Sequence, residues 1–272
     1  MLHCAPRYWC QKEQRFINNP RGARAGLYIG TELEKDEVEQ IIWATISGVE
    51  EWKITEDLLT PEESARVDEA IEIEQEMRLW METEESYDVA YIRYQIERYK
   101  ANEDISLVVL DYIELTPSLI SEYAMQTKMP ARGDSVLLNL SAQLKAMARQ
   151  FKVAMVAFTQ ISENARRDET IRDSGVIKDS KSLQNKADFA CCVFEITTKE
   201  LEKIQPILDA QPGFSITPNV VYHIYKVRKG RIKLCKVFAY QNLGNMSVMD
   251  CFVTNHKYEL MNVDPVEIGE IN

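Results

Sequence analysis

The sequence predicts an α/β fold in which helices cover a largely parallel sheet. Two apolar runs, residues 107–110 and 153–158, are continuous rather than alternating, a pattern typical of strands covered on both faces. Stretches with helical spacing of apolar residues separate these runs. Two later strand candidates, 220–225 and 232–240, flank the basic turn 228–231 and predict a C-terminal β-hairpin. Strands that alternate with helices favour a parallel sheet, so we expect one α/β domain that ends in this hairpin.

The first third of the chain contains one strand candidate and two helix candidates. Residues 27–29 form a short apolar strand, and apolar residues within 38–45 then follow helical spacing. A second helix begins at Thr60, because Thr can cap a helix, Pro61 fits its first turn and Glu63 can close a capping box. Its spacing predicts an apolar stripe made of Val67, Ala70, Ile71, Met77 and Trp80.

Helix and strand candidates alternate through the middle of the chain. A helix over 89–99 leads into a strand over 105–111. An apolar stripe predicts a helix over 137–151, which runs directly into the strand 153–158. The run 189–196 is a further strand candidate, and no internal repeat or linker-like segment interrupts the pattern.

The composition is that of an ordinary globular protein. Of the 272 residues, 45% are hydrophobic and 28% are charged, which excludes collagen-like, low-complexity and mostly disordered chains. The apolar runs fall far short of the roughly 18 residues that a membrane crossing needs, and the N-terminus has no apolar core of signal-peptide length. We therefore expect a cytoplasmic protein that does not enter a membrane. The six cysteines lack C-x-x-C spacing and are expected to be reduced thiols.

The net charge of −11 is unevenly distributed along the chain. Residues 32–104 contain 23 acidic and 7 basic residues, whereas the remainder has a net charge of +5. Proteins that bind nucleic acid are usually basic. Because the acidity is confined to one stretch, the total charge does not exclude a nucleic-acid partner.

Polar residues follow four of the predicted strands, where ligands gather in parallel sheets. A polar residue after a buried strand often only meets solvent, but these residue types together suit phosphate chemistry. Asp111 could position Mg²⁺, Glu32 could act as a general base on water, and Gln160 could hydrogen-bond a γ-phosphate. Lys226 and Arg228 are one residue apart, so an extended strand would present both cations on one face, as phosphate oxygens require.

Basic residues also gather in a long polar stretch between Gln160 and Asp188. A loop of that length in a compact domain is more often functional than passive. Counting Asp188, the stretch has six acidic and six basic residues, so it is not a simple basic patch. Its candidate nucleic-acid contacts are Arg166, Arg167, Arg172, Lys178 and Lys181.

These motifs together resemble the RecA-type motor domain of the DnaB-like replicative DNA helicases, over residues 26–240. Residues 27–33 are similar to the family's strand ending in Ser-Leu-Glu-Met, and 111–115 to its Asp-Tyr-Leu-Gln-Leu segment. Residues 154–162 resemble the strand that ends in Ser-Gln-Leu-Ser. The resemblance implies a RecA-like three-layer fold, with Glu32 as catalytic base, Asp111 as the Walker B residue that holds Mg²⁺, and Gln160 as phosphate sensor.

Two further motifs of the resemblance concern DNA and the neighbouring subunit. Residues 177–188 are similar, without gaps, to the segment that borders the family's single-stranded DNA loop, although Lys178 replaces Arg and Lys181 replaces Gly. Residues 226–230 resemble Lys-x-Arg-Asn-Gly, whose Lys and Arg reach the neighbour's nucleotide. The Pro-Thr-Gly that usually follows is absent. The resemblance implies ATP and Mg²⁺ as cofactors, single-stranded DNA as substrate, a homo-oligomeric ring (a hexamer in this family), and a primase or helicase loader as partner.

The family's phosphate-binding P-loop, G-x-x-x-x-G-K-[ST], has no match in this sequence. The resemblance places it about 25 residues before Glu32, where the glycines Gly22, Gly26 and Gly30 do not fit and no Gly-Lys pair occurs. In RecA-like sheets the strand leading into this loop is central, so its loss would leave two strands without a partner. We expect a truncated or split motor that binds ATP weakly.

The expected organisation is a divergent, poorly ordered N-terminus over 1–25, a motor domain over 26–245 and a C-terminal tail over 246–272. Two other functions stay open from the sequence. One is a catalytically inactive RecA-like interaction module, favoured by the missing P-loop. The other is a different RecA-type ATPase, such as a recombinase or a clock-type protein, which the matches at 177–188 and 226–230 disfavour.

Overall fold

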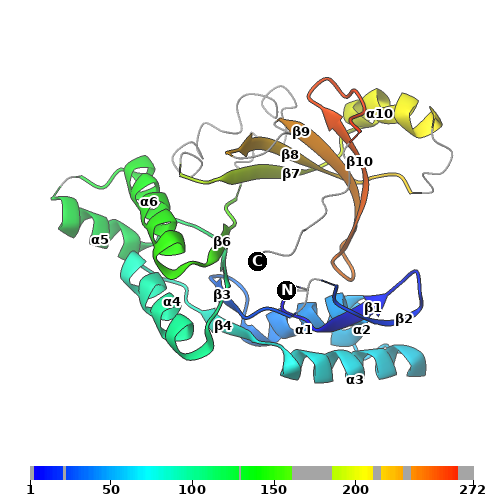
Figure 1. Cartoon of the computed structure of the whole chain (residues 1–272), viewed down its shortest axis with the longest axis horizontal. Helices are drawn as coiled ribbons and strands as arrows, with labels where there is room; N and C mark the ends of the chain where they lie inside the picture. Colours follow the sequence, from blue (N-terminus) through cyan, green and yellow to red (C-terminus); the bar gives the residue numbers. More distant parts are fainter. Residues whose placement is uncertain are drawn as a thin grey trace. The chain divides into compact units, whose positions relative to one another are not determined.

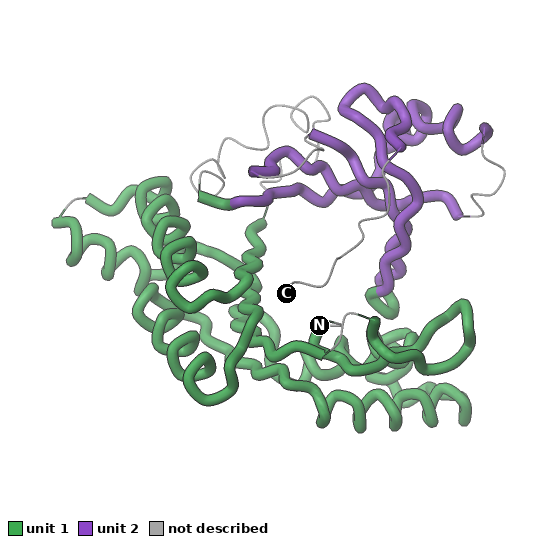
Figure 2. The backbone as a smooth tube through the Cα atoms, viewed as in Figure 1, with its two compact units in different colours: residues 1–187, 244–246 green, residues 188–243, 247–272 purple. Residues whose placement is uncertain are grey.

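The chain divides into two compact units in a computed structural model. The structure describes residues 3–20, 23–128, 130–160, 186–210, 216–228 and 234–262. The first unit comprises Met1–Ala187 with Gly244–Met246, and the second comprises Asp188–Leu243 with Ser247–Asn272 (Figure 2).

The first unit is built on the predicted parallel sheet. Its four strands lie in the order β4-β3-β5-β6, and all neighbours are parallel. Their bounds are Gly26–Gly30 for β3, Leu79–Thr83 for β4, Leu107–Asp111 for β5 and Ala154–Ala157 for β6. In register, Gly30 lies opposite Thr83 on one side and Asp111 on the other. The four strands therefore end at one carboxyl edge.

Helices cover both faces of this sheet. Figure 1 shows α4, α5 and α6 on one side, and α1, α2 and α3 on the other. The helices span Lys35–Ser47 (α1), Glu51–Thr55 (α2), Pro61–Glu76 (α3), Val89–Glu103 (α4), Pro117–Thr127 (α5) and Gly133–Phe151 (α6). The predicted capping box of α3 is present, because the Glu63 amide donates to Thr60 Oγ1 at 3.2 Å and the Thr60 amide donates to Glu63 Oε2 at 3.0 Å.

The core of the first unit consists of two clusters that share the strands. Residues of β3 and β5 alternate between them, so Leu27 and Ile29 pack in one cluster and Tyr28 in the other. Ile92 and Leu140 join the first cluster from α4 and α6. The second cluster receives α1 and α3 side chains, among them Val38, Ile42, Ile46, Ala70 and Ile73. Coverage on both faces explains the continuously apolar sequences of β3 and β5, whereas most residues of β6 are exposed, so the predicted coverage of 153–158 on both faces was wrong.

The second unit contains an antiparallel sheet in the order β10-β9-β8-β7. Its elements are β7 (Phe189–Glu195), α10 (Thr198–Ala210), β8 (Val220–Val227), β9 (Cys235–Asn242) and β10 (Ser247–Asn255). The predicted C-terminal hairpin is confirmed as β8 and β9, which pair antiparallel. The parallel part of the fold is thus confined to the first unit.

The structure differs from the expected organisation at several positions. The single motor domain over 26–245 separates into two units, and the expected tail over 246–272 begins with β10, which pairs with β9. Residues 1–25 contain a hairpin of β1 (Arg7–Cys10) and β2 (Arg15–Asn18). Ala5 is fully buried against the second cluster, and this burial anchors the segment.

Some helices and strands have bounds that differ from those predicted from the sequence, and two helices were not predicted. Helix α3 ends at Glu76, because Met77 is extended, and Trp80 therefore lies on β4 rather than on the helix. Helices α5 and α10 were not predicted. Among the described residues, no helix combines the length and the apolar character that crossing a membrane requires. All six cysteines are free, and burial is the main cause that raises the pKa of the Cys192 thiol to about 11.

Candidate nucleotide site at the carboxyl edge of the parallel sheet

Three predicted site residues follow neighbouring strands of the parallel sheet. Asp111 is the last residue of β5, Glu32 comes shortly after β3, and Gln160 shortly after β6. Strand β5 pairs with both β3 and β6. The structure thus brings Glu32, Asp111 and Gln160 to one edge of one sheet, as predicted from the strand ends.

Backbone hydrogen bonds fix the chain where it leaves these strands. The Thr31 amide donates to the Asp111 carbonyl oxygen at 2.9 Å, and the Tyr112 amide donates to Thr31 Oγ1 at 3.2 Å. On the other side of β5, the Ile113 amide donates to the Phe158 carbonyl oxygen at 2.8 Å. These bonds tie the exits of β3, β5 and β6 together and limit the freedom of the residues that follow.

A buried tyrosine holds the Asp111 carboxylate. The Tyr28 hydroxyl donates to Asp111 Oδ2 at 3.0 Å, and Tyr28 is only 5% exposed. Burial, and then the nearby Asp111 charge, raise the pKa of Tyr28 far above its ordinary value, so the phenol stays protonated as a donor. The ring packs over Gly30, where a Cβ atom would lie 2.8 Å from Tyr28 Cε1. Gly30 is therefore needed for Tyr28 to reach Asp111.

A second tyrosine accompanies Glu32. Hydrogen bonding to the Glu32 carboxylate is the largest cause that raises the pKa of Tyr112. Glu32 itself is exposed, whereas Asp111 is half-buried. An exposed carboxylate can accept a proton from water, and a held carboxylate can present an oxygen to a cation. The two acids thus have environments that suit different roles.

Tyr28 and Tyr112 were not predicted from the sequence as part of this site. Tyr28 lies within an apolar run and has the pattern of an ordinary core residue. One signal was available, because Tyr28 and Gly30 share a face of β3 and a glycine beside an aromatic residue at a strand end leaves room for its ring.

The carboxylates of this site suit Mg²⁺, but the site lacks a group that would bind the phosphates. Mg²⁺ is usually held by one or two carboxylates together with waters and substrate phosphates, and Asp111 and Glu32 can supply such carboxylates. Within the part of the chain that the structure describes, no group of three or more His, Cys, Asp or Glu side chains could hold a metal alone. The phosphate side of the site does not fit, because the sequence contains no Gly-Lys pair and so no P-loop.

Lys226 and Arg228 belong to the second unit. Lys226 lies near the end of β8 and Arg228 directly follows the strand. Arg228 Nη1 lies 3.2 Å from Asp188 Oδ1, and the Arg228 amide donates to the Asp188 carbonyl oxygen at 2.8 Å. Both side chains of this ion pair are more than half exposed. Such pairs contribute at most about 1 kcal/mol, so little free energy opposes release of Arg228.

The predicted nucleic-acid contacts lie outside the described residues. They are Arg166, Arg167, Arg172, Lys178 and Lys181. Residues 229–231 of the basic turn also lie outside the described part.

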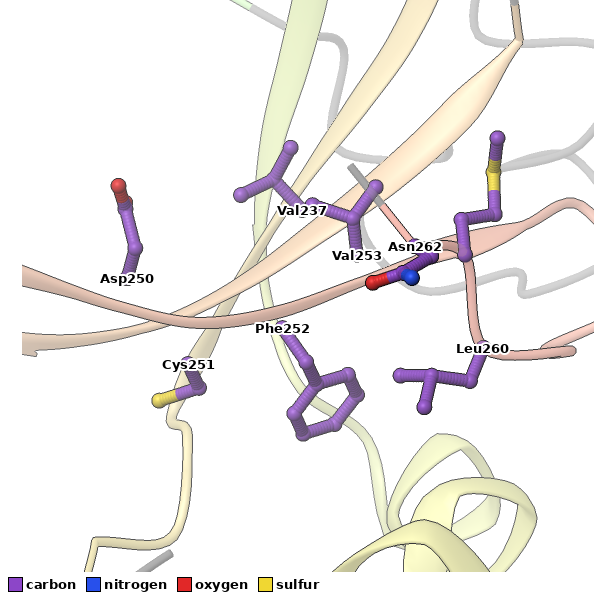
Figure 3. Close-up of a pocket in the computed structure, with 8 residues that line it drawn as sticks. Val237, Asp250, Cys251, Phe252, Val253, Leu260 and Asn262 are labelled. Atoms are coloured by element: carbon purple, nitrogen blue, oxygen red, sulfur yellow. The ribbon is translucent and has the colours of Figure 1, made fainter. Parts of the chain in front are cut away.

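The second unit has a hollow of about 320 Å³ on its sheet (Figure 3). It is lined by Val237, Asp250, Cys251, Phe252, Val253, Leu260, Met261 and Asn262. Figure 3 shows Asp250 apart from Asn262, with apolar side chains between them. The polar groups do not converge, so this hollow lacks the arrangement that a catalytic or phosphate site requires.

The second unit also contains a buried polar cluster that was not predicted from the sequence. Glu200 is 2% exposed and accepts a hydrogen bond from the Tyr258 hydroxyl at 3.3 Å. His223 Nε2 lies 3.6 Å from Glu200 Oε1, and Lys236 Nζ lies 4.0 Å from the centre of the Tyr258 ring. The cluster joins α10 to the sheet and has a structural role in this unit.

The chain is similar to known proteins over most of its length. The model of the DnaB-like helicase C terminal domain family matches residues 15–246. The SPbeta prophage-derived uncharacterized protein YorI of Bacillus subtilis (strain 168) is 30% identical over 260 residues, which cover 94% of this chain and 51% of YorI. The replicative DNA helicase DnaB of Mycoplasma pneumoniae is 28% identical over 120 residues, 43% of this chain and 24% of that protein. The chain thus spans about half the length, or less, of these curated relatives.

Solved structures show the same fold. One solved ATPase domain superposes with a TM-score of 0.63 at 18% identity, covering 84% of this chain and 75% of that domain. A DnaB-like replicative helicase, described with its interactions with primase, gives a TM-score of 0.63 at 18% identity, over 83% of this chain and 50% of that chain. With the family model matching most of its length, the chain belongs to the DnaB-like helicase C-terminal domain family.

Proposed function

We propose that this chain takes part in ATP-dependent DNA unwinding as a subunit of a ring-shaped helicase, where Glu32, Asp111 and Gln160 act on the nucleotide, and that the chain alone binds ATP weakly because its sequence contains no P-loop. One observation supports this most strongly: three side chains of the right chemistry follow adjacent parallel strands in a chain of the DnaB-like family. Ligands of open parallel sheets gather at that edge.

Each residue has a distinct task in this proposal. Glu32 accepts the proton of the attacking water, as its exposure allows. Asp111, oriented by the Tyr28 hydroxyl, directs a carboxylate oxygen toward Mg²⁺ or its water shell. Gln160 donates to the terminal phosphate. Asp111 would hold Mg²⁺ there, and the ion would supply positive charge to offset the negative charge of the phosphates.

The neighbouring subunit completes the site. Lys226 and Arg228 contact the phosphates bound by the adjacent subunit of a homo-oligomeric ring, where an arginine can neutralise transition-state charge. The exposed Asp188 partner keeps Arg228 in place until the ring forms and is then exchanged for phosphate. The ring is a hexamer, as the family resemblance implies, and one solved relative is described with primase, which makes primase a proposed partner here.

Basic residues between Gln160 and Asp188 bind single-stranded DNA through its phosphates. Such binding is sensitive to salt and tolerant of sequence. The test is fluorescence polarisation of a labelled oligonucleotide with the full chain and with the double variant Lys178→Glu/Lys181→Glu. We expect affinity to fall at least tenfold and the salt dependence to become shallower, because phosphate contacts are lost.

A charge-matched control separates local contact from net charge. Lys12→Glu/Lys35→Glu makes the same change in total charge on the first unit and should bind as the unmodified chain does. Equal losses in both double variants, or no loss in either, would contradict the proposed DNA contact.

A catalytically inactive interaction module is the second candidate, and the missing P-loop favours it. Mixed rings with an intact DnaB-like helicase separate the two functions. An active contribution predicts that Glu32→Gln lowers ATP hydrolysis of the mixed ring, whereas Glu85→Gln, an exposed acid after β4, does not. An inactive module predicts no effect of either variant.

A further inference from the structure

The two oxygens of the Asp111 carboxylate have different surroundings. The Tyr28 hydroxyl donates to Oδ2 at 3.0 Å, whereas no group among the described residues donates a hydrogen bond to Oδ1. A carboxylate oxygen has two lone pairs, and the phenol engages one of those on Oδ2. Oδ1 therefore keeps its full capacity to bind a cation, and Oδ2 does not.

The packing of Tyr28 fixes which oxygen is engaged. Tyr28 is buried in the cluster that α1 and α3 supply, together with Ile42 and Ile73. Its hydroxyl lies over Gly30, where a Cβ atom would come within 3.2 Å of the hydroxyl oxygen. Gly30 is in register with Asp111, so the two residues lie side by side at the ends of β3 and β5. A ring packed in this way has little freedom to follow the carboxylate if the carboxylate turns.

Divalent cations differ in how they use a carboxylate. Mg²⁺ demands octahedral geometry with oxygens at about 2.0–2.1 Å, whereas Ca²⁺ takes about six to eight oxygens at about 2.3–2.6 Å and can bind both oxygens of one carboxylate. A cation bound to both oxygens of Asp111 would share Oδ2 with the phenol hydrogen, which carries partial positive charge. The Tyr28 hydrogen bond thus opposes binding through two oxygens and leaves binding through Oδ1 open.

We infer that Tyr28 sets the cation preference of this site: by engaging Oδ2 it makes Asp111 a ligand with one available oxygen, so that the site selects Mg²⁺ over Ca²⁺. Tyr28 acts through Asp111 and is therefore a positioning residue. The inference rests on the proposed function, in which Asp111 is the residue that faces the cation.

A purely structural role for the hydrogen bond has a different consequence. If Tyr28 only stabilised the end of β5, its loss would weaken the binding of Mg²⁺ and Ca²⁺ alike. If Tyr28 controls how many oxygens Asp111 presents, its loss changes the ratio of the two affinities. The ratio is therefore the quantity to measure.

The test measures cation preference without nucleotide. The probe is Mn²⁺, whose binding to the full chain is followed by water proton relaxation and which is then displaced by Mg²⁺ or by Ca²⁺. Asp111→Asn identifies the part of the Mn²⁺ binding that belongs to this site. For the unmodified chain, Mg²⁺ should displace that Mn²⁺ at a lower concentration than Ca²⁺ does.

Two variants should change this preference. In Tyr28→Phe, the ratio of the Ca²⁺ to the Mg²⁺ midpoint concentration should fall at least threefold, because Oδ2 becomes available. Gly30→Ala should lower the ratio as well, because its Cβ atom would lie 2.8 Å from Tyr28 Cε1 and the ring must shift. Tyr99→Phe is the matched control, since the Tyr99 hydroxyl also donates to a carboxylate, that of Glu82 on β4, and its ratio should stay unchanged. Circular dichroism verifies that each variant is folded before titration.

An unchanged ratio in folded Tyr28→Phe would overturn the inference, and so would equal weakening of both ions. Mn²⁺ binding that Asp111→Asn does not reduce, or no binding at millimolar Mn²⁺, would overturn it too. Failure of the proposed function is a separate outcome, in which Tyr28→Phe changes the ratio but Glu32→Gln leaves ATP hydrolysis of mixed rings unaffected.

Discussion

At the scale of single residues, the candidate site depends on pairs in which a tyrosine holds an acid. Strand-end acids could be predicted from the sequence, because a polar residue directly after an apolar run is visible in the pattern. Their partners could not, because Tyr28 lies inside an apolar run like any core aromatic residue. The same holds for Asp188, whose pairing with Arg228 depends on the register of β7 and β8.

The contribution of the Tyr28–Asp111 hydrogen bond can be tested by measuring the free energy of unfolding. Tyr28→Phe should lower the free energy of unfolding at pH 7 by about 1.5–3 kcal/mol, the usual contribution of a hydrogen bond to a charged group. The pKa of Tyr28 is raised in the folded state, so its stabilising contribution is complete below the ordinary tyrosine pKa of about 10 and is lost as pH rises beyond it. Urea unfolding should therefore show a difference between the two proteins that narrows above pH 10. A difference in the free energy of unfolding that stays constant above pH 10 would contradict this expected pH dependence.

At the scale of helices and strands, continuous apolar runs identified β5 and β6 correctly, and the Thr60 capping box identified the start of α3. Strand β4 was missed because Trp80 continues the apolar spacing of α3, and only the extended backbone at Met77 separates the two elements. Helix α5 was missed although its cap, Thr116 followed by Pro117, repeats the Thr60-Pro61 signal.

The two Thr-Pro caps make a matched pair of predictions. Thr60 is exposed and only accepts from Glu63, whereas Thr116 is buried, accepts from Leu119 and donates to the Tyr87 carbonyl oxygen at 2.6 Å. Thr60→Ala should lower the free energy of unfolding by about 1 kcal/mol, because the helix loses its N-cap hydrogen bond. Thr116→Ala should cost about 2–3 kcal/mol, because a buried carbonyl group also loses its donor. Chemical denaturation of both variants measures the two changes in the free energy of unfolding. Equal losses of stability would show that burying the cap contributes no additional stability.

At the scale of the whole molecule, the acidic total charge reflects the helices of the first unit. The stretch 32–104 that carries most of the acid contains α1, α2, α3 and α4. The division into two units could not be predicted, because no linker-like composition marks position 188. Both main apolar clusters lie in the first unit, while the second unit buries its polar cluster around Glu200.

This division predicts that the second unit can be destabilised selectively. Glu200→Ala removes a buried acid from the cluster with His223 and Tyr258, and breaking such a cluster costs about 3–5 kcal/mol. Hydrogen exchange should become faster in β8 and β9, with little change in β3 and β5. Glu202→Ala, an exposed acid on the same helix, is the control and should change neither unit. Equal acceleration in both sheets would show that the units unfold together.

We propose that Glu32 and Asp111 are the hydrolytic acids of a DnaB-like motor in a chain whose sequence contains no P-loop to hold the ATP phosphates. Equilibrium titration of the full chain with a fluorescent ATP analogue in the presence of Mg²⁺ tests it most directly. We expect no saturation in the micromolar range, because the sequence contains no P-loop whose backbone and lysine could contact the β- and γ-phosphates. Saturable binding with a micromolar Kd would contradict it.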